Sequence, residues 1–495
     1  MKSLFVTLLI LQIFFSSTIF AEFDYNSNCK NAYAQILSLK IDDARESILA
    51  EKSKNPKNAI CISLDIYVDF FSLFCSDNRE EFDQLKTNKD LRLAILEKES
   101  KNSPWYRYSI ADLHIQWAIT RFKFQENTTA ALELNKAYKL LNENQRLYPN
   151  FYPNLKGLGM LNVLLGALPE NYQTVLSKIG MSGSTSAGIN MLMKLVQLDK
   201  NSPYYFLHEE AILYLSFVNT DLLKNQNIEI PILPFILKLP ADNLLKYYLL
   251  AKNYAKIKNN DSVIRSLALR PIGKEYLNFY YLDYLMGIAK LNKLELNGSV
   301  YLDRFVLLYK GINNIKDAYL KLSWYNLIAG KKAEADKFNS LVLIKGYSFS
   351  EKDKQAIAES KLENTYNITL LKARLQYDGG YFLKSELLLS TISSAKFSKE
   401  NLIEYNYRFG RIYQAEEKYV KAIDYYNKTI NSALNQKNYF ASNSALQLGL
   451  IYEKLKKTKE ALYYYELCLA MKDHEYKNSI DNQAKIGLKR LKNQN

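Results

Sequence analysis

The segment from Gly180 to Gly188 is the first candidate for chemistry, because it resembles a loop that binds phosphate groups. Gly183 and Gly188 have the interval that such a loop requires, since backbone N–H groups must approach the phosphates closely there. Ile189, however, occupies the position of the lysine that contacts the phosphates, and no strand precedes the segment. We therefore expect these residues to form a turn that caps the following helix.

Two other short motifs could carry chemistry but are incomplete. Residues 27–30 and 76–78 match two of the three motifs of penicillin-recognising serine enzymes, yet no Lys-Thr-Gly follows. His208 is followed by two glutamates but lacks the second histidine of a zinc-binding helix. We therefore predict no catalytic residue, no metal and no cofactor. An enzyme of the cell envelope, with residues that only folding brings together, remains the alternative.

One pattern of small and aromatic residues occurs twice near the C-terminus with identical intervals. A glycine is followed by a tyrosine, an alanine and a second tyrosine at Gly410, Tyr413, Ala422 and Tyr426, and again at Gly449, Tyr452, Ala461 and Tyr465. Small residues at these places allow two antiparallel helices to approach closely, and the tyrosines fill the remaining volume. We expect all eight residues to be core.

This pattern is similar to the tetratricopeptide repeat (TPR), specifically over residues 400–470 and in architecture before them. The resemblance implies an all-α fold, an α-α superhelix of TPR-like helical hairpins. It also implies a scaffold that binds another protein or an extended peptide, since such repeats build interaction surfaces more often than catalytic centres. The identity of the partner does not follow.

The resemblance further implies that the first helix of each hairpin lines the binding groove. Counted from the two glycines, the groove positions are Glu404, Tyr407, Arg411 and Gln414, then Asn443, Leu446, Leu450 and Glu453. Members that clamp a peptide carboxylate place Lys, Asn and Arg there, and this chain offers only Arg411 and Asn443. We therefore predict a mixed polar and apolar groove, with partner contacts from Tyr407, Arg411, Gln414, Asn443 and Glu453. The alternative is that these are ordinary interhelix positions.

Apolar residues recur at helical intervals along most of the chain, which has only 17 glycines and 10 prolines. The periodicity predicts helices over 30–50, 154–166 and 399–415, among others, and a capping helix over 476–492. Residues 228–240 contain three prolines and cannot continue a helix. We place there a boundary between a domain at 22–228 and a solenoid at 241–495, and we expect a buried crossover.

A second resemblance involves a glycine-rich stretch at 157–188. Its order of Gly157, Asn162, Leu168-Pro169 and Gly180 to Gly183 is similar to the eukaryotic inclusion-body clearance family of TPR proteins. The resemblance implies a shared helical scaffold with a kinked helix pair, not a shared role. The glycines permit close helix approach. A carrier of lipid or another hydrophobic ligand that uses this insertion is a further alternative function.

The first 21 residues have the features of a secretory signal peptide, with Lys2 before a short apolar run and Ala21 at the expected cleavage site. We expect a periplasmic or extracellular protein that is soluble after cleavage. The net charge of +15 would suit nucleic acid, but export argues against that ligand and leaves peripheral contact with an anionic membrane surface. Disulfide pairing stays open among Cys29, Cys61, Cys75 and Cys468.

Overall fold

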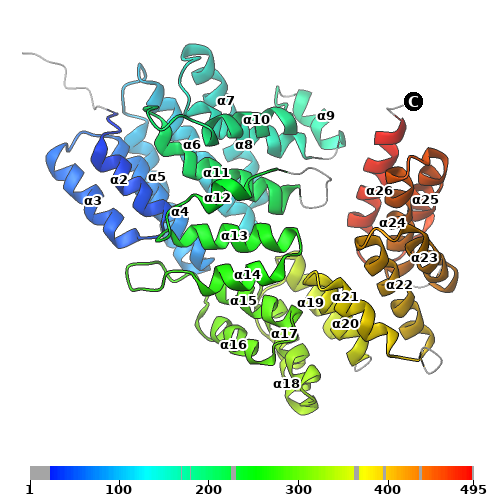
Figure 1. Ribbon diagram of the computed structural model, residues 1–495. Coiled ribbons are helices and arrows are strands. Elements are labelled where there is room, and N and C mark those ends of the chain that lie inside the picture. The colour runs from blue at the N-terminus through cyan, green and yellow to red at the C-terminus, as the bar shows by residue number, and fades with distance from the viewer. Residues whose placement is uncertain are drawn as a thin grey trace, which may run out of the picture.

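The computed structural model describes residues 23–168, 170–178, 180–223, 230–361, 367–393, 397–433 and 437–492, and the regular elements within these ranges are all helices. Successive helices pack as antiparallel hairpins that stack along the chain (Figure 1). The all-α fold, an array of TPR-like helical hairpins, is thereby confirmed. The expected signal peptide, residues 1–21, lies outside the described residues.

The N-terminal body is built from the first ten helices of the described chain and two short helical turns. They are α2 (Ser27–Leu37), α3 (Ile41–Lys54), α4 (Ile60–Ser76), α5 (Arg79–Leu96), α6 (Pro104–Lys123), α7 (Asn127–Leu147), α8 (Asn154–Gly166), α9 (Glu170–Lys178), α10 (Thr185–Val196) and α11 (His208–Phe217), with the short η1 (Tyr205–Leu207) and η2 (Val218–Leu222) on either side of α11. The single helix predicted over 30–50 is wrong, because Leu39 has a φ of 62° and turns the chain between α2 and α3.

The middle of the chain continues the array without a change of architecture. Its helices are α12 (Leu233–Leu237), α13 (Leu244–Lys256), α14 (Asn260–Ala268), α15 (Tyr281–Asn292), η3 (Leu296–Gly298), α16 (Ser299–Leu308), α17 (Ile315–Ile328), α18 (Lys332–Ile344) and α19 (Glu351–Ser360).

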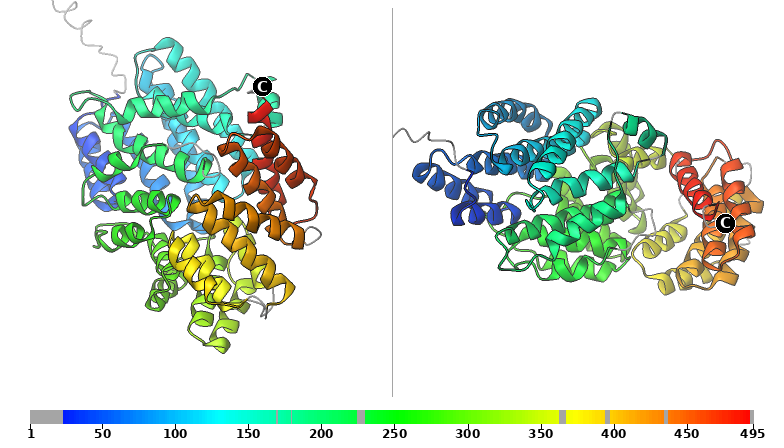
Figure 2. Two further views of the ribbon diagram at one scale, coloured as in Figure 1. Left: turned by 45° about the vertical axis from the view of Figure 1, so that its right-hand side comes forward. Right: turned by 90° about the horizontal axis from the view of Figure 1, so that it is seen from above.

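The C-terminal helices form a stack at one end of the molecule, opposite the N-terminal helices (Figure 2). They are α20 (Ile368–Asp378), α21 (Phe382–Ser390), α22 (Lys399–Ala415), α23 (Tyr419–Ala433), α24 (Phe440–Lys454), α25 (Thr458–Ala470) and α26 (Lys477–Lys492). Helix α20 packs against α15 and α17, which joins the stack to the rest of the array.

Eight hairpin turns along the chain share one backbone geometry. In each, a residue with positive φ follows the first helix, and the next residue donates its N–H to a carbonyl five positions earlier, at 2.8–2.9 Å. This bond closes the C-terminal end of a helix in the Schellman motif. The positive-φ residues are Leu39, Gln125, Lys258, Leu294, Gly330, Gly380, Glu417 and Lys456. Hairpins of one design therefore extend far beyond the two recognisable repeats.

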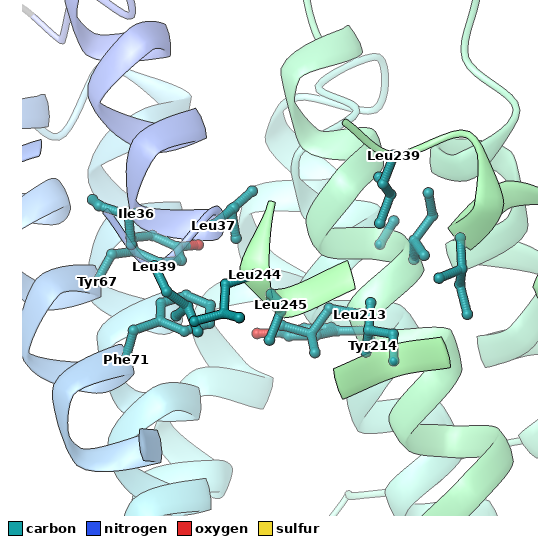
Figure 3. Close-up of a cluster of buried hydrophobic side chains, with 14 of the residues drawn as sticks. Ile36, Leu37, Leu39, Tyr67, Phe71, Leu213, Tyr214, Leu239, Leu244 and Leu245 are labelled. Atoms are coloured by element: carbon teal, nitrogen blue, oxygen red, sulfur yellow. The ribbon is translucent and has the colours of Figure 1, made fainter. Parts of the chain in front are cut away.

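Residues 230–240 lie between α11 and α13 inside one hydrophobic core. Ile232 and Ile236 are fully buried, and they belong to a cluster that extends from α2 to α15. Figure 3 shows side chains of α2 and α4 beside those of α11 and α13 in this cluster. The buried crossover is therefore confirmed as far as the described residues from 230 onward extend. The proposed boundary between two halves stays a prediction, and helices on both of its sides contribute to this core.

The glycine-rich stretch brings α8 and α10 into close contact. A Cβ added to Gly188 would lie 2.4 Å from the carbonyl oxygen of Gly159, and one on Gly166 would lie 2.5 Å from the Thr185 nitrogen. The predicted close approach is thus confirmed. Ser184 caps α10 by accepting a hydrogen bond from the Ala187 N–H, so the 180–188 segment is the helix-capping turn that the sequence favoured.

The four cysteines are buried free thiols in the structure. Cys29 of α2 and Cys61 of α4 are neighbours joined by a side-chain hydrogen bond, which with burial raises the pKa of the Cys29 thiol well above its usual value. Cys75 and Cys468 lie in separate parts of the core.

Candidate partner-binding site

A row of polar side chains connects the first helices of three C-terminal hairpins, α20, α22 and α24. Arg411 of α22 donates hydrogen bonds to the hydroxyls of Tyr377 (3.2 Å) and Tyr407 (3.0 Å). Tyr407 in turn donates to Oδ1 of Asn443 on α24 at 3.0 Å. The guanidinium also lies over the Tyr377 ring, 5.0 Å from its centroid. These contacts hold the Arg411 guanidinium in place among the positions predicted to line the groove.

Gln414 and Gln447 extend this row. The Gln414 amide donates to Gln447 at 2.9 Å, and its carbonyl accepts from the hydroxyl of the signature residue Tyr426 at 2.5 Å. Gln447 donates to Asn443 at 3.4 Å, which closes the network between α22 and α24. We call Tyr377, Tyr407, Arg411, Gln414, Asn443 and Gln447 the inner polar row. Gln447 was not among the predicted residues, although its place one helical turn after Asn443 could have indicated it.

The expectation that Tyr407 faces an open groove is wrong, because only 1% of this residue is exposed. Its ring packs against Phe440, at 4.9 Å between centroids, and edge-on against Tyr439 at 5.6 Å. At Tyr407, helix α22 faces the next hairpin and not solvent. The tyrosine is therefore a buried member of the row that holds Asn443 by a hydrogen bond. Arg411, Gln414 and Asn443 are partly exposed, and their contact with a partner stays a prediction.

Glu453 lies apart from the row and pairs with the last helix instead. Its carboxylate accepts from Arg490 of α26 at 2.6 Å and from the Tyr465 hydroxyl at 2.7 Å. Burial alone would raise the pKa of Glu453, but the hydrogen bonds from Arg490 and Tyr465 hold it below its usual value. The carboxylate thus has an evident structural role at the α24–α26 contact.

Seven of the eight signature residues are buried in the core, and Tyr452 is the exception. The Cβ of any residue larger than glycine at 410 would lie 2.7 Å from the Tyr426 ring, and at 449 it would lie 2.5 Å from the Tyr465 ring. Tyr413, Ala422, Tyr426, Ala461 and Tyr465 are buried as well. Tyr452 is only partly buried, and it stacks on Tyr464 with 5.4 Å between ring centroids.

A buried ion cluster that the motifs did not indicate lies in the N-terminal body. The Lys156 ammonium of α8 is 2.9 Å from Asp112 of α6 and 2.8 Å from Glu210 of α11, and none of the three residues is more than 5% exposed. The hydroxyls of Tyr33 and Tyr67 bind Glu210, and Tyr67 also binds Asp112. Because no reactant could reach groups so enclosed, we interpret the cluster as structural.

Comparison with known proteins locates the repeat in the C-terminal stack. Residues 402–473 match the family model described as tetratricopeptide repeat. This TPR match contains the five predicted partner-contact residues. A solved structure, titled "Crystal structure of APC/C hetero-tetramer Cut9-Hcn1", aligns with 91% of this chain and 87% of that chain at 14% identity, with a TM-score of 0.22. A search of curated proteins found no match.

No helix in the described part of the chain combines the length and apolar composition needed to cross a membrane.

Proposed function

We propose that this protein is an exported scaffold that binds another envelope protein, or an extended peptide of one, through the inner polar row. The observation that carries the proposal is the row itself: partly exposed Arg411, Gln414, Asn443 and Gln447 within the TPR match. TPR folds are typically non-catalytic and present such stripes to partners. The character of residues 1–21, which resemble a secretory signal peptide, supports export.

The chemistry of the row favours a partner segment rich in hydrogen-bond acceptors. Arg411 supplies a guanidinium that is held over the Tyr377 ring and by hydrogen bonds to Tyr377 and Tyr407, and its remaining N–H groups lie in the guanidinium plane. The Asn443 carbonyl already accepts from Tyr407 and Gln447, so its amide N–H groups are what it offers to a peptide backbone. Gln447 donates one N–H to Asn443 and accepts one bond from Gln414, which leaves it one further donor and one further acceptor site. An extended peptide or acidic loop could therefore be held along α22 and α24.

Site-directed photocrosslinking tests this proposal in cells. A photoreactive phenylalanine at Gln447 should yield a discrete adduct with a second protein, and Arg411→Ala should reduce that adduct at least several-fold. The same probe at Val420, which is 85% exposed on α23, is the matched control and should yield none. An adduct from Val420 alone, or one from Gln447 that Arg411→Ala leaves unchanged, would remove the row as the binding site.

The export part of the proposal has its own measurement. N-terminal sequencing of protein purified from its native host should give a chain that begins after Ala21. A mature chain that retains residues 1–21 would contradict cleavage and export by this route without affecting the crosslinking result.

A further inference from the structure

A cavity of about 550 Å³ lies inside the N-terminal body, remote in sequence from the inner polar row. It reaches between α4, α8, α11, α13 and α15, where the buried Met160, Leu213 and Leu249 form part of its wall. Small-molecule sites occupy roughly 300–1,000 Å³ and are mostly apolar. A tightly packed protein core, by contrast, leaves few voids larger than a water molecule. The volume is therefore that of a binding site rather than of a packing defect.

Aromatic rings from three helices and one loop line one side of the cavity. Phe74 contacts Tyr248 and Phe279 with 5.5 and 5.6 Å between centroids, and Tyr281 lies 6.2 Å from Tyr248. Phe70 continues the same surface along α4, 6.3 Å from Phe74. Such a continuous surface of ring faces and edges suits a long aliphatic ligand, because methylene groups can pack along it at any position.

The charged groups at the cavity wall neutralise one another. Lys252 pairs with Asp221 at 2.7 Å, and Lys123 pairs with Asp77. The two ammonium groups are thus balanced by two carboxylates, and the wall carries no net charge from them. The cavity wall therefore provides no net electrostatic attraction for a highly charged ligand.

Most polar atoms at the wall already have hydrogen-bond partners, which argues against a peptide. Ser216 accepts from Asn253 at 2.6 Å, and Thr220 donates to Asp221 at 2.6 Å. Tyr214 is different, because its buried hydroxyl has no hydrogen-bond partner among the described residues. A peptide would bring an N–H and a C=O with every residue, and burying them unpaired is costly. A ligand with a long apolar body and few polar atoms avoids that cost.

We propose that this cavity binds a single linear acyl chain, supplied either by a free fatty acid or by a membrane phospholipid. The proposal is independent of the inner polar row and of the protein partner proposed for it. It places ligand binding among α4, α8, α11, α13 and α15, and the stretch at 157–188 that the sequence suggested for a hydrophobic ligand supplies only part of the wall, through Met160 and Leu164 of α8.

Displacement of a dansyl-labelled undecanoic acid from the purified full-length protein tests the proposal. Fatty acids from decanoate to hexadecanoate should displace the probe with affinities that rise up to roughly fourfold per added methylene, and then level off once the cavity is full. Transfer of a labelled phospholipid out of phosphatidylglycerol vesicles would identify the membrane as the source. Absence of both displacement and transfer would overturn the proposal.

A cavity-filling variant gives the structural control. Leu164 of α8 is partly exposed and lines the cavity, so Leu164→Trp should fill it and weaken probe binding at least tenfold. Leu383→Trp introduces the same side chain at a 63% exposed position on α21 and should leave probe binding unchanged. Equal thermal unfolding midpoints would show that both variants fold. If Leu164→Trp folds and binds the probe as tightly as the wild type, or if only an apolar peptide binds, the cavity is not an acyl site.

Discussion

The ring of Tyr465 lies between two glycines that come from different helices. A Cβ on Gly449 of α24 would lie 2.5 Å from Cδ1 of the ring, and one on Gly487 of α26 would lie 2.5 Å from Cζ. The ring is fully buried and its hydroxyl is held by Glu453. It therefore has no direction in which to move away from an added methyl group.

Gly449→Ala should consequently destabilise the protein by about 1–3 kcal/mol, as overpacking of a rigid core does. Urea unfolding followed by circular dichroism measures the change. Val420→Ala, at an exposed position of α23, is the control and should change stability by less than about 0.5 kcal/mol. If Gly449→Ala unfolds at the same urea concentration as the wild type, the helices can move apart at this position without a loss of stability.

Lys156 is the only cation that the described side chains bring within ion-pair distance of Asp112 and Glu210. Burial raises the pKa of Glu210, while the neighbouring Lys156 opposes that rise. Lys156→Met should destabilise the protein by about 3–5 kcal/mol near neutral pH, because two buried carboxyl groups lose their counter-charge. The loss should shrink as the pH falls, because burial raises the pKa of Glu210 and this group therefore takes up a proton more readily in the folded state than when unfolded.

The double variant Lys156→Met with Glu210→Gln separates charge from packing. Removing one carboxylate should recover part of the lost stability and flatten the pH dependence of unfolding. If the single variant shows the same deficit at every pH, the cluster contributes through packing and not through charge.

The eight hairpin turns place a non-glycine residue in the left-handed backbone region at six positions. This conformation costs L-amino acids roughly 1–2 kcal/mol, whereas glycine adopts it freely. Lys456, between α24 and α25, has a φ of 58° and an exposed side chain. Lys456→Gly should therefore stabilise the protein by up to about 1 kcal/mol, which thermal unfolding can measure.

Gly380 provides the opposite control in the turn between α20 and α21. Its φ is 82°, and an added Cβ would lie 1.9 Å from the Lys258 carbonyl oxygen. Gly380→Ala should destabilise the protein. If Lys456→Gly and Gly380→Ala change the free energy of unfolding in the same direction, the left-handed backbone conformation of these turns does not limit the stability of the array.

The largest hydrophobic core of the molecule extends from α2 to α15, and helices on both sides of the crossover build it. Leu277, ahead of α15, donates its backbone N–H to the carbonyl of Leu39 at 2.9 Å, and Leu244 packs in the same cluster as Ile36. A fragment that ends at residue 228 would leave much of this apolar surface uncovered. We expect such a fragment to bind a hydrophobic dye and to unfold without a cooperative transition.

Co-expression with residues 229–495 should restore a cooperative transition, because the missing helices and the buried crossover would again cover the core. A fragment that unfolds cooperatively by itself and binds no dye would support the domain boundary that the three prolines suggested.

The sequence alone was sufficient to determine the helical array and its two best repeats. Helical periodicity is a local property, so the ranges 154–166 and 399–415 coincide with α8 and α22. The signature glycines and alanines could be recognised because close helix contact admits few residue types at Gly410 and Gly449. The burial of Tyr407, by contrast, could not be predicted, since a residue at its position on the first helix can face either solvent or the next hairpin.

Only the tertiary structure decided the ion cluster, the cavity and the extent of the repeats. Lys156, Asp112 and Glu210 come from three helices, and no spacing along the chain relates them. The cavity is equally a product of several helices and loops. The turns at Leu39, Gln125 and Lys456 share a backbone shape without sharing a residue type, because hydrogen bonds between backbone groups can hold a left-handed residue whose side chain gives no signal.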